Sequence, residues 1–280
     1  MNEKTEFLDK SEAKIYLLYM LRKIFDITES ENIPIYASGG TCLGMMRHKG
    51  IIPWDDDIDL MIFRKDYEKF VKACEKNLKS PIVIRTREND KFHCEEFAKI
   101  CLLDDDGNYT DLSIDIFELD ETNPERKKFR EFQSFCLKRL YFIKKYKATL
   151  AGKGEYRPGS LKAKIGVGFF ARIFTFNFIE KCFYKLIMGE KKQGDYVVNW
   201  GASYSYKKAT YPKIAFGTPQ KMPFENTYMW AEEHPEMILE RLYGKDYMTP
   251  PPKDKQIDHG VRKFKCTALD YENIKKEIGM

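Results

Sequence analysis

The sequence lacks several features that would place it in a simple class of proteins. Its seven cysteines include no CxxC pair, and their odd number and scattered positions argue against a disulfide framework or a zinc site. His93 and Cys94 are neighbours on the chain and would face opposite ways on a strand, which argues against a shared metal. No apolar run follows a basic start at the N-terminus, so we expect a cytoplasmic protein without a signal peptide.

The chain also lacks a strong charge of one sign. Charged residues make up 32% of its 280 positions, but the formal net charge is only +5. A balance this even does not indicate a nucleic-acid-binding protein. The hydrophobic content of 43% is enough to fill the core of one large domain or two small ones. We therefore expect a folded protein with no nucleic-acid partner.

Apolar residues recur with helical and strand periods in alternation, which indicates an α/β (α+β) fold. The expected architecture is a mixed sheet flanked by helices, with an added helical region. The expected elements are a helix over 11–27 capped by Ser11, a strand over 33–37, a helix over 41–48, a strand over 57–63, a helix over 66–77, and a hairpin of 97–103 and 112–119 joined by a turn at 104–108.

Composition changes after Asn123-Pro124 and predicts three segments. We expect 1–124 to form the catalytic core, 125–210 to form a basic and aromatic helical region that faces a membrane or the acceptor, and 211–280 to complete the site. Within the helical region, charges interrupt residues 161–188 too often for a membrane-spanning helix. These residues predict a buried helix pair that closes the substrate cleft, and a position on the membrane surface is the alternative.

The acidic run Trp54-Asp55-Asp56-Asp57-Ile58-Asp59 is the most informative feature of the sequence. Alternate residues of a strand share a face, so the carboxylates of Asp57 and Asp59 should stand side by side. Two like charges at that distance need a cation nearby. A solvated acidic turn is the alternative for Asp55, Asp56 and Asp57, whereas a calcium loop fails because no glycine occupies its sixth position.

Asp115 lies in a second strand pattern, on the face opposite Ile114 and Ile116. Together with Asp57 and Asp59 it would supply three carboxylate ligands, which suit Mg²⁺, or Mn²⁺, bound beside substrate phosphates. We expect two such ions and a metal-assisted phosphoryl transfer. Asp115 is also a candidate general base, although the sequence leaves the identity of that base open.

A small-residue turn, Ser38-Gly39-Gly40-Thr41, follows a short apolar segment and would let the backbone approach a phosphate. Arg47 has the planar fork that binds phosphate with two hydrogen bonds, and His48 is either a second substrate contact or a helix-end residue. Trp54 is expected either in the core or stacked on the base of a nucleotide.

Three ordered segments resemble the signature of the LicD family, which is related to fukutin: Ser38-Gly39-Gly40-Thr41, Arg47-His48-Lys49-Gly50 and Pro53-Trp54-Asp55-Asp56-Asp57-Ile58-Asp59. Residues 114–117 and 242–252 resemble later segments of the family. The resemblance implies a nucleotidyltransferase-like fold in which Gly39, Gly40 and Thr41 contact phosphate while Asp57, Asp59 and Asp115 bind Mg²⁺. It also implies transfer of phosphocholine from CDP-choline to a sugar of a teichoic acid, capsule or lipopolysaccharide, with release of CMP.

Several alternatives stay open at the level of sequence. The donor is expected to be a CDP-alcohol, with ribitol or glycerol as alternatives to choline. The expected acceptor is a lipid-linked glycan. Eight aromatic residues are available to surround a choline: Tyr196, Trp200, Tyr204, Tyr206, Tyr211, Trp230, Tyr243 and Tyr247.

An NTP-dependent nucleotidyltransferase and a non-catalytic glycan-binding or metal-binding assembly factor are the competing functions. Peripheral contact with the inner face of the membrane is a further expectation.

Overall fold

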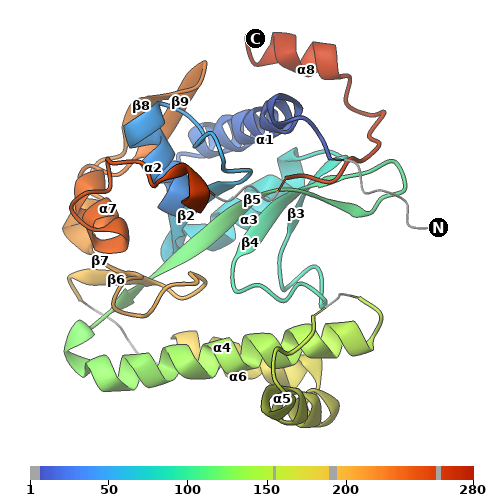
Figure 1. Cartoon of the computed structure of the whole chain (residues 1–280), viewed down its shortest axis with the longest axis vertical. Helices are drawn as coiled ribbons and strands as arrows, with labels where there is room; N and C mark the ends of the chain where they lie inside the picture. Colours follow the sequence, from blue (N-terminus) through green and yellow to red (C-terminus); the bar gives the residue numbers. More distant parts are fainter. Residues whose placement is uncertain (1–6, 154–155, 189–193, 257–259) are drawn as a thin grey trace. The chain divides into compact units, whose positions relative to one another are not determined.

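A computed structural model describes residues 7–153, 156–188, 194–256 and 260–280 (Figure 1). The helices are α1 (Lys10–Ser30), α2 (Gly39–His48), α3 (Arg64–Asn77), α4 (Lys127–Leu150), α5 (Leu161–Ile173), α6 (Phe176–Met188), α7 (Pro235–Tyr243) and α8 (Tyr271–Glu277). The strands are β1 (Tyr36–Ala37), β2 (Ile58–Phe63), β3 (Ile82–Arg85), β4 (Ala98–Leu103), β5 (Tyr109–Thr122), β6 (Tyr196–Asn199), β7 (Thr210–Pro212), β8 (Gln220–Phe224) and β9 (Thr227–Ala231). The expected mixed α/β architecture is confirmed.

The chain folds into two compact units that are discontinuous in sequence. Unit one consists of Met1–Arg85, Ala98–Glu118 and Lys213–Met280, and unit two of Thr86–Phe97 and Leu119–Pro212. Strand β5 contributes residues to both units. The three consecutive functional segments expected from composition stay a prediction, because this division concerns packing and does not test their roles.

Unit one is built on strands in the order β1-β2-β5-β4-β3, with helix α3 against β2 and β3. Its core contains the strand residues Ile58, Leu60, Ile114 and Ile116, all with no exposed surface. Burying each such side chain stabilises the fold by about 1.5–3 kcal/mol. The expected alternation is therefore confirmed around Asp59 and Asp115, whereas Met61 of β2 and Phe117 of β5 are buried on the opposite face.

Helix α1 begins one residue before the predicted start, and its cap is different from the prediction. Asp9 is the N-cap residue, and its carboxylate accepts from the backbone N–H of Ser11 at 2.8 Å. Glu12 completes a capping box by accepting from the N–H of Asp9 at 3.2 Å. The prediction of Ser11 as the cap is wrong, because Asp9, two positions earlier, forms the reciprocal pair of hydrogen bonds with the first turn of the helix.

The predicted β4–β5 hairpin is confirmed, with a turn held by Asp104. The carboxylate of Asp104 accepts from the backbone N–H groups of Asp106 and Asn108 at 3.0 and 2.8 Å. Gly107 follows with a φ of +77°, which a side chain would disfavour. The register of the hairpin pairs Lys99 with Asp115. This register places Lys99 beside Asp115, which is one of the predicted metal ligands.

Unit two combines a small sheet with three helices. The last residues of β5 pair with β6, and β6 pairs with β7, both antiparallel. Helices α5 and α6 both pack on α4, around a core that includes Leu137, Val167, Ile179 and Phe183. The prediction that 161–188 is a buried helix pair is wrong for the outer faces of α5 and α6, which are exposed. Within the described residues, no helix is long and apolar enough to cross a membrane.

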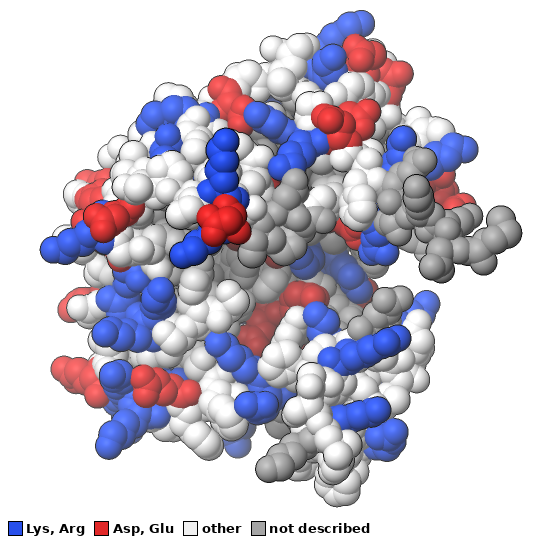
Figure 2. Space-filling model, viewed as in Figure 1, with Lys and Arg blue, Asp and Glu red and all other residues white. Residues whose placement is uncertain are grey.

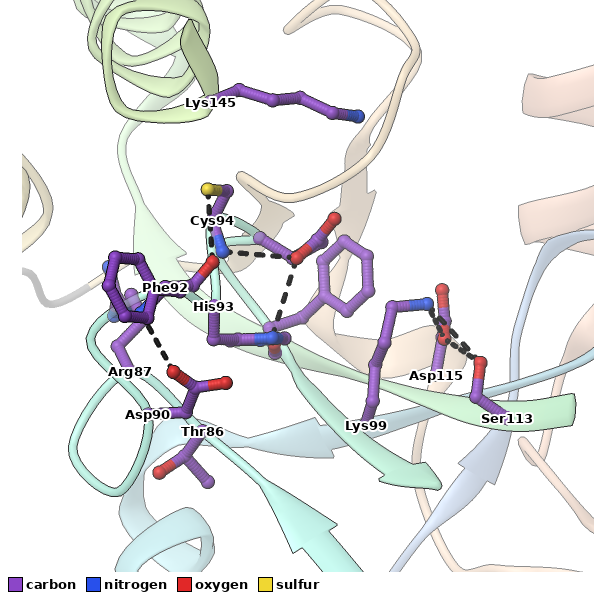
Figure 3. Close-up of polar contacts among 12 residues, drawn as sticks. Thr86, Arg87, Asp90, Phe92, His93, Cys94, Lys99, Ser113, Asp115 and Lys145 are labelled. Atoms are coloured by element: carbon purple, nitrogen blue, oxygen red, sulfur yellow. Dashed lines mark hydrogen bonds and ion pairs between the residues drawn. The ribbon is translucent and has the colours of Figure 1, made fainter. Parts of the chain in front are cut away.

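All seven cysteines are free thiols, and four of them are buried. The side chains of His93 and Cys94 contact different backbone carbonyls, although Glu95 lies 3.4 Å from Nδ1 of His93 and accepts from the backbone N–H of Cys94 at 3.1 Å (Figure 3). The ring Nε2 of His93 lies 2.7 Å from the carbonyl oxygen of Phe97, while the thiol of Cys94 donates to the carbonyl of Phe92 at 3.2 Å. Their placement fits a structural role for both residues in the loop that precedes β4.

Candidate functional site

The small-residue turn and the acidic strand are joined directly in unit one. Helix α2 begins at Gly39, two residues before the predicted start, with Ser38 as the residue that precedes it. The backbone N–H of Ser38 donates to the carbonyl of Asp59 at 2.9 Å, and the N–H of Asp59 donates to the hydroxyl of Thr41 at 2.8 Å. These bonds fix the first turn of α2 against the start of β2.

The two glycines at the start of α2 face carboxylates. A Cβ atom on Gly40 would lie only 2.8 Å from a carboxylate oxygen of Asp55. A Cβ atom on Gly39 would lie 3.6 Å from a carboxylate oxygen of Asp59 and 3.8 Å from the hydroxyl of Tyr243. Gly39 also has a φ of +49°, which glycine adopts without strain. The absence of side chains here brings the N-terminus of the helix close to the acidic residues.

The structure brings together a different set of carboxylates from the set that the sequence predicts as metal ligands. In the described part of the chain, Asp55, Asp56 and Asp57 are the one acidic group whose ligand oxygens all lie within 4.8 Å of one another. The sequence placed Asp55 and Asp56 outside the ligand set. The structure thus adds both residues to the candidates, whereas the predicted set of Asp57, Asp59 and Asp115 stays a prediction.

Burial, followed by the charges of neighbouring carboxylates, raises the pKa values of the aspartates in the site. Asp57 lies at the surface, but crowding by protein desolvates its carboxyl group and, with the neighbouring Asp55, raises its pKa to about 7. Desolvation, followed by the charges of Asp57 and Asp115, raises the pKa of Asp59 well above its usual value. The pKa of Asp55 is also raised, mainly by burial. Such a cluster favours a proton or a bound cation over free negative charge.

Asp115 contacts Lys99, a positively charged residue that was not predicted to belong to the site. The ammonium group of Lys99, on β4, lies 2.5 Å from a carboxylate oxygen of Asp115 on β5, and the hydroxyl of Ser113 donates to the same oxygen at 3.4 Å (Figure 3). The charge of Lys99 also opposes the rise in the pKa values of Asp57 and Asp59. Lys99 therefore offsets part of the negative charge of the cluster.

Arg47, His48 and Trp54 form a small group at the end of α2. Arg47 donates from Nε to His48 Nε2 at 2.9 Å and from its guanidinium to the carbonyl of Tyr247 at 3.0 Å. Desolvation, aided by the charge of Arg47, lowers the pKa of His48, so the ring is neutral at pH 7. Trp54 lies edge-on to His48, with ring centroids 5.8 Å apart, and packs against the core. Roles for these three residues in binding the donor stay predictions.

The β8–β9 hairpin holds the loop that leads into the acidic run. At its tip, the carboxylate of Glu225 accepts from the backbone N–H of Ile51 at 2.8 Å and lies 2.5 Å from the ammonium group of Lys14. The N–H of Glu225 donates to the carbonyl of Lys49 at 2.7 Å. Sequence reasoning missed this residue because 174 positions separate it from Ile51.

Comparison with known proteins agrees with this arrangement. The sequence profile of the family described as LicD/FKTN/FKRP, nucleotidyltransferase domain, matches residues 32–152. That range contains the start of α2, the acidic run and Asp115. This match places a LicD-family domain at residues 32–152 of the chain. The resemblance seen in the sequence is therefore confirmed.

Individual relatives match over different lengths. The lipopolysaccharide cholinephosphotransferase LicD of Haemophilus influenzae is 27% identical over 266 residues, which are 90% of this chain and 96% of that protein. The ribitol-5-phosphate transferase FKTN of Mus musculus is 53% identical over 36 residues, only 13% of this chain and 8% of that protein. An uncharacterized protein of Rickettsia typhi is 44% identical over 57 residues, 20% of this chain.

The residues of the site fit a divalent metal ion. Five aspartates, at 55, 56, 57, 59 and 115, supply the hard oxygen atoms that Mg²⁺ and Mn²⁺ prefer. The raised pKa values of Asp55, Asp57 and Asp59 show that positive charge is in deficit among them. A bound cation would relieve that deficit, whereas Lys99 alone leaves the pKa of Asp57 at about 7.

Proposed function

We propose that this protein transfers a phospho-alcohol from a nucleotide donor to a hydroxyl of a cell-surface glycan. Phosphocholine from CDP-choline, with release of CMP, is the first choice, and a teichoic acid, capsule or lipopolysaccharide is the acceptor class. The full-length similarity to the Haemophilus influenzae cholinephosphotransferase supports the transferred group. The observation that carries the proposal is the approach of Gly39 and Gly40 to Asp59 and Asp55.

That approach brings phosphate-binding and metal-binding chemistry to one place. The N-terminus of a helix of ten residues presents backbone N–H groups and a partial positive charge, which favour phosphate oxygens. The nearby carboxylates would hold Mg²⁺, which neutralises phosphate charge and stabilises the leaving group. Asp57 and Asp59 are the proposed ligands together with Asp115, and Asp55 and Asp56 are further ligand candidates.

The chain's own residues would orient the substrates and handle the proton. Thr41 holds the backbone N–H of Asp59, so the main chain of this residue is fixed relative to the helix before substrate arrives. Asp115 is the proposed general base for the acceptor hydroxyl, and its contact with Lys99 keeps a positive charge beside the carboxylate. Arg47 would contact the donor phosphate through its guanidinium group.

The direct test is CMP release from CDP-choline by the full chain with Mg²⁺ and a glycan acceptor. Asp57→Ala should reduce the rate by at least about a hundredfold, because it removes both a ligand and the charge that holds the metal. Asp106→Ala is the matched control, since Asp106 belongs to a second run of three aspartates at the exposed hairpin turn. Equal rates for the two variants would contradict the proposed role of Asp57.

Ribitol phosphate is a second candidate for the transferred group. The local 53% identity to the ribitol-5-phosphate transferase FKTN supports it. A panel of CDP-choline, CDP-ribitol and CDP-glycerol, each offered with the same acceptors, would identify the donor by the rate of CMP release. Release of pyrophosphate from an NTP would instead support a nucleotidyltransferase. Nucleotide binding that does not respond to Mg²⁺ or Mn²⁺ would support a non-catalytic assembly factor.

A further inference from the structure

Helix α5 exposes the large apolar side chains that a soluble helix normally buries. Leu161, Ile165, Phe169 and Ile173 recur every fourth residue and are 57–74% exposed. Residues at this spacing lie along one face of a helix. The buried side of α5 carries smaller residues, Val167 and Ala171. The larger part of the apolar surface of α5 therefore faces away from unit two.

Aromatic rings extend this exposed surface from α5 to α6. Phe169 contacts Phe170 with ring centroids 5.4 Å apart, Phe170 contacts Phe174 at 5.2 Å, and Phe174 contacts Phe178 at 4.7 Å. Phe169, Phe170 and Phe178 are each more than 40% exposed. We call this surface, formed by Leu161, Ile165, Phe169, Phe170, Ile173, Phe174 and Phe178, the α5–α6 patch. A continuous apolar patch of this kind marks an interaction site.

The charges around the α5–α6 patch are almost all positive. Among the described side chains of residues 161–188, Lys164, Arg172, Lys181 and Lys185 are basic, and Glu180 is acidic. Glu180 forms an ion pair with the buried Lys144 of α4 and so does not offset these charges at the surface. Figure 2 shows basic side chains interspersed with uncharged surface over α5 and the adjoining part of α4. The patch therefore fits a partner that is apolar and negatively charged.

We propose that the α5–α6 patch inserts into the interface of a lipid bilayer that contains anionic lipids. Phenylalanine and aliphatic side chains enter the region between headgroups and acyl chains, while lysine and arginine contact the lipid phosphates. A second copy of the chain fits less well, because a twofold interface would place the basic residues of one patch against those of the other. This proposal concerns unit two and does not depend on the chemistry proposed for unit one.

Vesicle co-sedimentation of the full chain tests the proposal. We expect the wild-type chain to bind phosphatidylcholine vesicles that contain phosphatidylglycerol, and to bind vesicles of phosphatidylcholine alone much less. The double substitution Ile165→Ser and Phe169→Ser should lower the binding constant by about tenfold or more, since it removes two inserted apolar side chains. Both side chains are more than half exposed, so the variant is expected to fold, which its thermal unfolding will check.

Two further variants separate the apolar and electrostatic contributions. Ile214→Ser is the matched control, because Ile214 is 69% exposed but belongs to unit one, and its binding should equal that of the wild type. Lys181→Glu with Lys185→Glu should abolish the preference for phosphatidylglycerol, with a loss of about tenfold or more from two reversed charges.

Three outcomes would overturn the proposal. The first is that the wild-type chain binds neither kind of vesicle, or binds both equally. The second is that the Ile165→Ser, Phe169→Ser variant binds as tightly as Ile214→Ser. The third is a dimer in analytical ultracentrifugation that this double variant abolishes, which would assign the patch to a second copy. Failure of CMP release with a soluble acceptor would bear only on the function of unit one, so the two proposals fail separately.

Discussion

The hydroxyl of Thr41 accepts a 2.8 Å hydrogen bond from the backbone N–H of Asp59. This bond joins the first turn of α2 to the first residues of β2, which are the two halves of the LicD signature. Thr41 is 5% exposed, so water does not replace the bond easily if it is lost. The geometry of the site therefore depends on a neutral side chain as well as on the aspartates.

Substitution of Thr41 should test this coupling. Thr41→Val keeps the shape of the side chain but leaves the N–H of Asp59 without its acceptor, which should cost about 1–3 kcal/mol of unfolding free energy. Thr41→Ser retains the hydroxyl and should cost less. Urea unfolding of both variants measures the difference. If serine and valine destabilise the protein equally, the hydroxyl has no special role.

Gly44 in α2 should not tolerate alanine. A Cβ atom there would lie 2.5 Å from the carbonyl oxygen of Gly50, a backbone atom of the loop before the acidic run. We expect Gly44→Ala to lose about 1–3 kcal/mol of stability despite the better helix propensity of alanine. Gly166→Ala in α5 is the control, because no atom outside its own turn of helix lies within 4 Å of the added carbon. The control should be neutral or more stable by up to about 1 kcal/mol in thermal unfolding.

Lys99 should compete with a metal ion for the acidic cluster. Lys99→Met removes the charge beside Asp115, so the variant should be less stable than the wild type in EDTA and should gain more in melting temperature from Mg²⁺. Lys76→Met, which alters an exposed lysine in the last turn of α3, should respond to Mg²⁺ as the wild type does. Melting temperatures that are insensitive to Mg²⁺ in all three proteins would contradict a metal site among these aspartates.

Glu232 should make stability depend on pH. It is fully buried, and desolvation raises its pKa from 4.5 to about 8. The folded state therefore retains a proton that the unfolded state releases above pH 4.5, so this residue lowers stability progressively as pH rises from 4.5 to about 8. Glu232→Gln should be on the order of a few kcal/mol more stable than the wild type above pH 8, with little difference at acidic pH.

The control for this titration is Glu240→Gln, an exposed glutamate on the neighbouring helix α7. The pH dependence of the unfolding free energy of Glu232→Gln is measured against this variant as well as against the wild type. A constant difference between Glu232→Gln and the wild type from acidic to alkaline pH would show that Glu232 keeps its ordinary pKa. Chemical unfolding at several pH values provides the measurement.

Local sequence patterns predicted the elements that carry the site. The alternation of Asp57, Ile58, Asp59 and Leu60 predicted a strand with one buried face because side chains of a strand point to opposite sides. The hairpin before Asp115 was predictable because its turn residues satisfy their own backbone groups. In both places, the information lies within a few residues of chain.

The contact between Lys99 and Asp115 was not predicted from the sequence. Lys99 lies on the predicted strand before the turn, and pairing the two strands of the hairpin would have brought it near Asp115. A shift in register between Cys101 and Leu103 decides which residue faces which, and this irregularity forms only when the sheet packs. Glu225 and Tyr243 come from segments distant in sequence, so no local signal placed them beside the acidic run or the start of α2.

The sequence by itself determined the resemblance to the LicD family, the strand alternation of the aspartates and the amphipathic helices, because each depends on residue type and short-range spacing. Only the tertiary structure decided which carboxylates gather, which lysine offsets them and which face of α5 is exposed. These properties depend on contacts between distant segments and on access to water. The periodicity of α5 shows that its apolar side chains share a face, but only packing on α4 shows that this face points outward.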